Sequence, residues 1–186
     1  MKVCLTGGIA CGKSLLSRYL NELGVETIDA DDVVHELIPD PAERRRIAAE
    51  VFADPVKRKV LEARLHPLVR ERIARFLSSS LSTHRSSLRL AVIPLLFEVH
   101  WDAEYDIICC IASSRDNQIS RMTTTRGYTR EEAEARLAAQ MPVEEKAAKS
   151  HYVIRNDGSA EDLRREAERF VTWLKARIGA EDSRNS

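Results

Sequence analysis

Short apolar runs alternate with longer amphipathic segments along the chain. Five runs, at residues 2–6, 25–28, 88–93, 105–111 and 152–154, have the length and apolar character of buried strands. Most segments between them space their apolar residues at helical intervals. This order predicts an α/β fold, in which a doubly wound five-stranded parallel sheet carries helices on both faces.

The stretch between the second and third predicted strands is helical throughout and too long for a simple crossover. It predicts a helical insertion at about 32–86 within a single domain of residues 1–186. Pro67 is expected to end one helix and begin another, and residues 78–87 form a polar, hinge-like loop. The helices of the insertion are expected near residues 33–38, 42–52, 56–65 and 67–77.

A polar helical hairpin follows the fourth strand. Its first helix runs from Arg115 to Thr125, and Thr129 with Glu132 forms a capping box for the second. Basic side chains continue through it, which suggests a lid at about 115–149 over a bound triphosphate. The alternative also remains open that most of these charges lie on a solvated face and pair with neighbouring glutamates. A last helix from Ser159 to about Arg177 ends the fold.

The turn after the first strand carries the clearest chemical signal. Gly7, Gly12, Lys13 and Ser14 fill the fixed positions of the phosphate-binding loop, G-x-x-x-x-G-K-[ST]. Glycines let backbone N–H groups close round an anion, and the following helix directs its positive end there. Lys13 adds a full charge for the β- and γ-phosphates, and the Ser14 hydroxyl can hold Mg²⁺.

Acidic residues follow the second strand on the same rim of the sheet. Asp29, Asp31 and Asp32 lie where the carboxyl ends of parallel strands face a ligand. Either Asp29 or Asp31 could cap the next helix, and a carboxylate here could also orient a nucleophile or bind Mg²⁺ through water. The residue types leave capping and catalysis equally open.

Composition excludes several classes of protein. The chain has 186 residues with 29 Lys and Arg against 29 Asp and Glu, so it lacks the basic excess of a nucleic-acid-binding protein. No apolar stretch approaches the ~20 residues of a membrane span. The four cysteines show no disulfide or zinc spacing, so we expect a cytoplasmic protein.

Among phosphate-loop proteins, a small-molecule kinase fits best. The N/T-K-x-D signature of GTPases is absent from the sequence. The third strand ends in Pro94, which disfavours the acidic strand end of an ATP-driven motor. Two alternatives stay open: a kinase for another hydroxyl acceptor, such as a nucleoside or nucleotide, and a non-catalytic nucleotide-binding module. On residue type alone His66 is more often structural than functional, and Glu98 could pair with a base or a ligand.

Several longer motifs lie along the chain, and three of them are far more specific than the phosphate loop: Asp29-Ala30-Asp31, Leu65-His66-Pro67-Leu68 and Pro94-Leu95-Leu96-Phe97-Glu98. Together the motifs resemble the dephospho-CoA kinase family. They cover most of residues 1–160 in the family's order. They are Leu5-Thr6-Gly7-Gly8-Ile9, Asp29-Ala30-Asp31, Leu65-His66-Pro67-Leu68, Pro94-Leu95-Leu96-Phe97-Glu98, Arg121-Met122 with Arg126, Ala138-Ala139-Gln140, and Val153-Ile154 with Asn156.

The resemblance implies transfer of the ATP γ-phosphate to the ribose 3′-hydroxyl of dephospho-CoA, with Mg²⁺ as cofactor. Asp31 would be the general base or orienting acid, with Arg121 and Arg126 as lid cations and Arg136 behind them. Asn156 would lie near the adenine. The family's ATP-binding residues correspond to Gly8, Ile9, Ala10, Cys11, Gly12, Lys13, Ser14 and Leu15. Its acceptor-binding residues correspond to Asp31, His66, Arg70, Pro94, Leu95, Phe97 and Glu98.

The chain also departs from the family pattern. The stretch between Leu37 and Phe52 is shorter than the family's, which bears on acceptor affinity. His151 stands where the family usually has Asp, and Ala10 where it usually has Gly. Cys11 lies near a helix N-terminus, so we expect either a lowered thiol pKa with ATP-protected alkylation or a small filler residue. We expect a monomer or a weak homo-oligomer.

Overall fold

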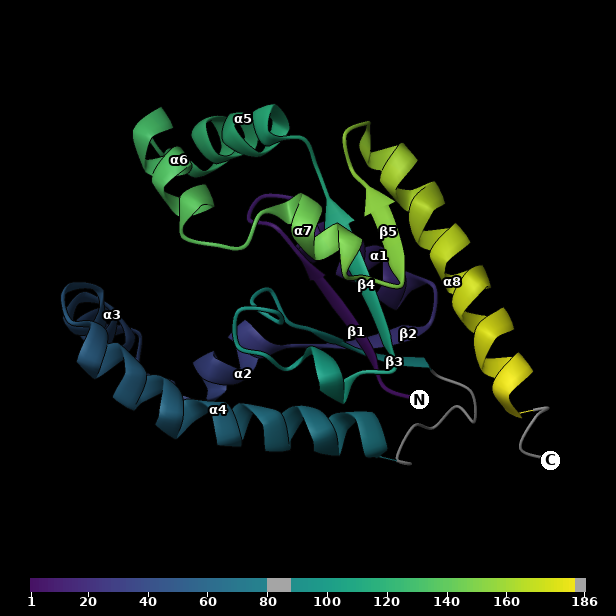
Figure 1. The fold of residues 1–186 in the computed structure, drawn as a ribbon, viewed down its shortest axis with the longest axis horizontal. Coiled ribbons are helices and arrows are strands. Elements are labelled where there is room, and N and C mark those ends of the chain that lie inside the picture. Colours follow the sequence, from purple (N-terminus) through teal and green to yellow (C-terminus); the bar gives the residue numbers. More distant parts are fainter. Residues whose placement is uncertain (80–87, 183–186) are drawn as a thin grey trace. The chain divides into compact units, whose positions relative to one another are not determined.

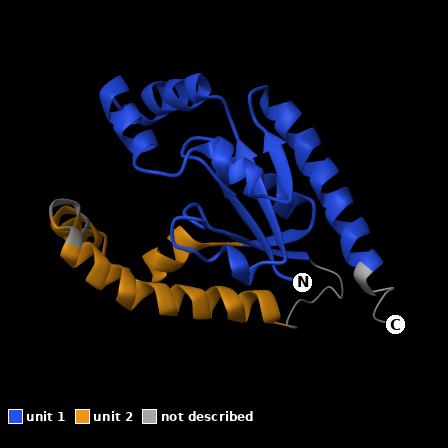
Figure 2. Cartoon of the chain, viewed as in Figure 1, with its two compact units in different colours: residues 1–27, 86–186 blue, residues 28–85 orange. Residues whose placement is uncertain are grey.

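The structure is a computed structural model that describes residues 1–79 and 88–182. The chain divides into two compact units, Met1–Thr27 with Ser86–Ser186, and Ile28–Arg85 (Figure 2). No helix in the described part of the chain is long and apolar enough to cross a membrane. The hinge-like loop predicted at 78–87 falls outside the described residues from residue 80 onward.

Five strands form one sheet in the order β2-β3-β1-β4-β5 (Figure 1). β1 pairs in parallel with both β3 and β4, and β4 pairs in parallel with β5. The predicted strands are confirmed to within two residues at each end. Their bounds are Val3–Gly7 (β1), Val25–Asp29 (β2), Leu88–Val92 (β3), Ile107–Ala112 (β4) and Tyr152–Arg155 (β5).

Helices pack on both faces of the sheet, as a doubly wound fold requires. On one face α1 (Lys13–Glu22) packs against α8 (Ala160–Asp182) over a core that includes Cys109. The next residue of β4, Cys110, points the other way, where α7 (Val143–Ala148) contacts β1 and β4. α8 runs past Arg177, where we predicted its end, because Ile178 still packs against the core.

The second unit is helical in its described residues after β2. α2 (Ala30–Leu37) contacts α4 (Pro55–Ser78), and α3 (Pro41–Ala53) also contacts α4. Asp40 caps α3 and Asp54 caps α4, and a proline follows each of them. Proline suits the first helical position because a backbone N–H there would have no partner within the helix. The predicted insertion at 32–86 falls almost wholly within this unit, and its acceptor-binding role stays a prediction.

The expected break at Pro67 is wrong. α4 continues through it as one helix. A proline inside a helix costs about 3 kcal/mol, because it removes one hydrogen bond and crowds the preceding turn. Val69 and Ile73, on the turns that follow, are 3% and 2% exposed, and their burial offsets that cost. Ala63, whose carbonyl loses its helical donor, is exposed to water.

The predicted hairpin is present after β4. It consists of α5 (Arg115–Arg126) and α6 (Arg130–Ala138). The capping box at Thr129 is confirmed, since its hydroxyl accepts from the Glu132 N–H and the Glu132 carboxylate accepts from the Thr129 N–H. We did not predict α7 as a separate helix. A short 3₁₀ turn, Asp102–Glu104, precedes β4.

Candidate active site

The phosphate loop joins β1 to α1, and two of its glycines are required by close contacts. A Cβ on Gly7 would lie 2.3 Å from the Ile111 carbonyl oxygen. Gly12 has a φ of 97°, and a Cβ there would lie 2.3 Å from Asn156 Nδ2. The loop therefore passes so close to β4 and the end of β5 that no larger residue fits.

Three consecutive carbonyls of this loop are tied to donor side chains. The Ile9 oxygen accepts from Gln118 Nε2 at 2.7 Å. The next two oxygens, of Ala10 and Cys11, accept from Arg121 at 3.2 Å and from Asn156 at 2.8 Å. Carbonyls held in this way leave the N–H groups at the start of α1 available for an anion.

Lys13 and Ser14 begin α1 immediately after the loop. The Lys13 ammonium donates to the Gly7 and Gly8 carbonyls at 3.0 and 2.8 Å, which keeps its charge beside the loop. Ser14 is exposed on the first helical turn. The Leu15 side chain packs against the hydrophobic core, so only its backbone could meet a phosphate.

Ala10 occupies a left-handed conformation, with a φ of 57°. For a residue with a Cβ this costs roughly 1–2 kcal/mol. Its methyl group is 8% exposed and packs with Ile119, Met122 and Ala133 of the helical hairpin. That burial recovers about 0.8 kcal/mol and explains how alanine is tolerated here.

Cys11 contradicts the expectation of a lowered thiol pKa. Burial raises its pKa, and the nearby charges of Lys13 and Arg121 offset this only in part. Its side chain is fully buried in the core, so the small-filler alternative is the one that the structure supports. Cys4, Cys109 and Cys110 are also buried free thiols.

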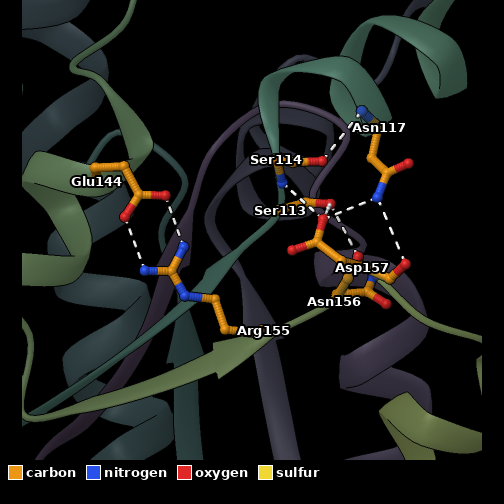
Figure 3. A network of polar contacts seen from close by, with 7 residues as sticks. All are labelled: Ser113, Ser114, Asn117, Glu144, Arg155, Asn156 and Asp157. Atoms are coloured by element: carbon orange, nitrogen blue, oxygen red, sulfur yellow. Dashed lines mark hydrogen bonds and ion pairs between the residues drawn. The ribbon is translucent and has the colours of Figure 1, made fainter.

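A polar network holds the loop after β4 against the loop after β5 (Figure 3). Asp157 Oδ1 accepts from Ser113 Oγ, Ser114 N and Asn117 Nδ2 at 2.7 to 2.8 Å. The Ser114 N–H and the other donors hold the Asp157 pKa well below its usual range. This role of Asp157 could not be predicted, because Asp157 and its donors are about 40 residues apart in the sequence.

The predicted lid cations lie in different surroundings. Arg121 donates to the Ala10 carbonyl, to Ser113 Oγ and, at 2.7 Å, to the Asn156 carbonyl. It therefore braces the phosphate loop in this structure. Arg126 is exposed at the end of α5, and Arg136 stacks over the Tyr128 ring at 4.3 Å. The catalytic roles of these arginines stay predictions.

A cavity of about 360 Å³ opens between the phosphate loop and the helical hairpin. Glu144, one of the lining residues, forms a bidentate ion pair with Arg155, with N–O distances of 2.6 and 2.7 Å (Figure 3). Hydrogen bonding to Arg155 lowers the Glu144 pKa. The lining residues are Gly8, Ile9, Ser113, Arg115, Gln118, Leu137, Ala138, Gln140, Met141, Pro142, Val143 and Glu144.

The Pro94–Glu98 loop follows β3 and is fixed by buried contacts. Lys146 lies 2.7 Å from Glu98 Oε1 and donates to the Pro94 carbonyl at 2.8 Å. Lys146 is one of the basic side chains of the predicted lid, yet it is fully buried because this carboxylate partners it. Leu95 is exposed, whereas Phe97 is buried, so these two predicted acceptor residues differ in access.

Two aspartates of the second unit have separate roles. The Asp29 carboxylate accepts from the Asp31 N–H at 2.8 Å and caps α2. Asp31 is exposed, and its carboxylate makes no hydrogen bond or ion pair with any residue that the structure describes. His66 and Arg70 lie one turn apart on the same side of α4.

Comparison with known proteins decides the family. The family model described as dephospho-CoA kinase matches residues 1–43 and 41–162. The chain belongs to the dephospho-CoA kinase family. It is 37% identical to the dephospho-CoA kinase of Geobacter sulfurreducens, over 92% of this chain and 96% of the relative.

Solved structures agree with this membership of the dephospho-CoA kinase family. The crystal structure of TT1252 from Thermus thermophilus is 32% identical, with a TM-score of 0.76 over 94% of this chain and 97% of that one. The Campylobacter jejuni dephospho-CoA kinase is 25% identical, with a TM-score of 0.68 over 94% and 98%. Shikimate kinase from Acinetobacter baumannii, at 16% identity and a TM-score of 0.60, shares the fold.

The two segments of the family match meet at residues 41–43, where α3 begins. This is the stretch in which the sequence is shorter than we expect for a dephospho-CoA kinase. Within residues 1–79 and 88–182, no group of three or more His, Cys, Asp or Glu could hold a metal ion.

Proposed function

We propose that this kinase transfers the γ-phosphate of ATP to the ribose 3′-hydroxyl of dephospho-CoA, producing CoA and ADP. Membership of the family over most of the chain supports this reaction. The observation that carries the donor half is the phosphate loop, whose three successive carbonyls are tied to Gln118, Arg121 and Asn156. A loop fixed before the nucleotide arrives loses little conformational freedom on binding.

On the donor side, we assign the β- and γ-phosphates to the N–H groups of the loop and to Lys13. Lys13 already lies at the loop, where its ammonium would exchange two carbonyl partners for phosphate oxygens. The exposed Ser14 hydroxyl suits Mg²⁺, a cation that prefers oxygen ligands and keeps several waters. Bound Mg²⁺ neutralises charge on the phosphates.

On the acceptor side, we assign the orientation of the hydroxyl to Asp31. Because Asp29 caps the helix, the carboxylate of Asp31 is left available in the described structure. In a loose phosphoryl-transfer transition state its main effect is alignment of the attacking oxygen rather than strong deprotonation. The family resemblance also implies acceptor contacts for His66 and Arg70, and for the Pro94–Glu98 loop.

The shortened stretch before α3 bears on acceptor affinity more than on ATP affinity. We propose that this enzyme binds its acceptor more weakly than its longer relatives do, because fewer helical residues surround it. We further propose a monomer or weak homo-oligomer in the cytoplasm. The buried free thiols fit a reducing compartment.

One assay tests the reaction. The protein is incubated with Mg-ATP and dephospho-CoA, and both ADP and CoA are measured, with adenosine and other nucleosides as competing acceptors. CoA and ADP should form in equal amounts, and Lys13→Met should abolish both. Turnover only with a nucleoside would favour a different acceptor class, and ATP binding without any turnover would favour a non-catalytic module.

A further inference from the structure

Lys146 is among the largest fully buried side chains in the described part of the chain. Its ammonium lies 2.7 Å from Glu98 Oε1 and donates to the Pro94 carbonyl at 2.8 Å. A lysine almost never lies fully inside a protein unless it is paired. Two partners from one loop are therefore what hold it there.

The same two partners are bonded to further parts of the site. The Pro94 carbonyl also accepts from Thr6 Oγ1 at 3.3 Å, and Thr6 is the residue before the phosphate loop motif. Glu98 Oε1 also accepts from the Met141 N–H at 3.0 Å. Met141 lines the cavity beside the phosphate loop. One network thus joins the end of β1, the loop after β3 and the segment before α7.

Stability alone does not account for such a pair. A buried ion pair often contributes no more than a well-packed apolar pair of the same size, because both charges lose their hydration. Its geometry does have a use here. Oε1 of Glu98 receives both donors, while Oε2 is buried and has no hydrogen-bond partner in the described structure. A buried carboxylate oxygen normally accepts a hydrogen bond.

We propose that Lys146 is a positioning residue for phosphoryl transfer. It holds the Pro94–Glu98 loop through the Pro94 carbonyl and the Glu98 carboxylate, so that this loop keeps the conformation that the acceptor meets. This inference rests on the proposed function, in which that loop binds the acceptor. It assigns Lys146 no contact with the reacting atoms.

The primary test compares Lys146→Met with Arg89→Met. Arg89 forms a pair of similar length, 2.7 Å to Glu26, at the opposite end of β3 from the loop. Lys146→Met should raise the KM for the acceptor by about ten-fold or more and leave the KM for ATP within about two-fold. Arg89→Met should change neither constant. A folded Lys146→Met enzyme with the wild-type acceptor KM would overturn the proposal.

The double variant Glu98→Gln/Lys146→Met separates positioning from simple charge balance. It contains no unpaired buried charge, so it should fold even where Lys146→Met does not. Glu98→Gln alone is the reference, because Glu98 itself belongs to the proposed acceptor site. If Lys146 were only structural, the double variant would have the acceptor KM of Glu98→Gln. Positioning instead predicts a higher acceptor KM in the double variant, because the Pro94 carbonyl also loses its donor.

If the proposed function itself is wrong, the wild-type enzyme forms no CoA, which distinguishes that outcome from failure of the positioning role. In that case amide hydrogen exchange is measured at residues 95–98, because Pro94 has no N–H, and at Met141. Exchange at both places should be about ten-fold faster or more in Lys146→Met than in Arg89→Met. Unchanged exchange at the loop would overturn the positioning role without any acceptor present.

Discussion

The side-chain amide of Asn156 donates a 2.8 Å hydrogen bond to the carbonyl oxygen of Cys11, 145 residues earlier in the chain. The bond joins the end of the last strand to the middle of the phosphate loop. The Asn156 side chain holds the phosphate loop in this structure. The place near the adenine of ATP, which the family resemblance implies for Asn156, stays a prediction.

We predict that Asn156→Ala weakens ATP binding through this contact. Loss of one buried hydrogen bond, with the Cys11 carbonyl left unpaired, costs about 1–3 kcal/mol. The KM for ATP should rise by about ten-fold, and the free energy of unfolding should fall by a similar energetic amount. Asn21→Ala is a matched control, because its amide bonds Thr27 on the surface. Equal ATP affinity in the two variants would contradict the prediction.

Asp157→Asn should lower stability in a pH-dependent way. All three donors bond Oδ1, so asparagine keeps an acceptor there and loses only the charge. Because the folded-state pKa of Asp157 lies below its ordinary value, its charge stabilises the fold fully above about pH 4 and less as the pH falls through the folded-state pKa. Asp157 is exposed, so screening limits the effect to about 1 kcal/mol.

Urea unfolding of the wild type and Asp157→Asn between about pH 3 and about pH 8 measures this difference. The difference in unfolding free energy should be constant from about pH 5 upward and should shrink at the acid end. A difference that stays the same down to about pH 3 would mean that the charge is not its source.

Cys11 should react slowly with iodoacetamide in the native enzyme. Burial raises its pKa and blocks access, so little thiolate is present at neutral pH. Labelling followed by mass spectrometry should give the same slow rate with and without ATP, and a fast rate after denaturation. Fast native labelling that ATP suppresses would show that the original hypothesis of a reactive thiol was correct.

Asp31→Asn should lower kcat by about 10²–10⁴ while ATP binding stays within about two-fold. The side chain keeps its size and loses the negative charge that would align the acceptor hydroxyl. Asp32→Asn, one residue on and also exposed, is the matched control. Initial rates with dephospho-CoA and calorimetric ATP titration give the two readouts. A nearly active Asp31→Asn enzyme would remove Asp31 from the proposed mechanism.

The strands, the phosphate loop and the capping box could be predicted because each depends on neighbours in the sequence. The choice between Asp29 and Asp31 as the cap could not, since both residue types suit the position. The break at Pro67 was wrong because burial of later residues in α4 outweighs a local preference.

The contacts that fix the site were missed for a different reason. Gln118 meets the Ile9 carbonyl across 109 residues, and Lys146 meets the loop of Pro94 across 52. The residues next to Gln118 and Lys146 in the sequence do not indicate these contacts. Lys146 looks like an ordinary polar residue unless its pairing with Glu98 is known. Pairings at such separations follow from the topology of the sheet, which a single sequence predicts only in outline.

Ala10 has one more consequence. Its methyl group shares a small hydrophobic cluster with Ile119 and Met122 of α5 and Ala133 of α6. Separating the hairpin from the loop would expose that cluster, so the two segments should open together as one cooperative unit rather than fray independently. A substitution on the buried side of the hairpin would then change nucleotide binding without contacting the nucleotide.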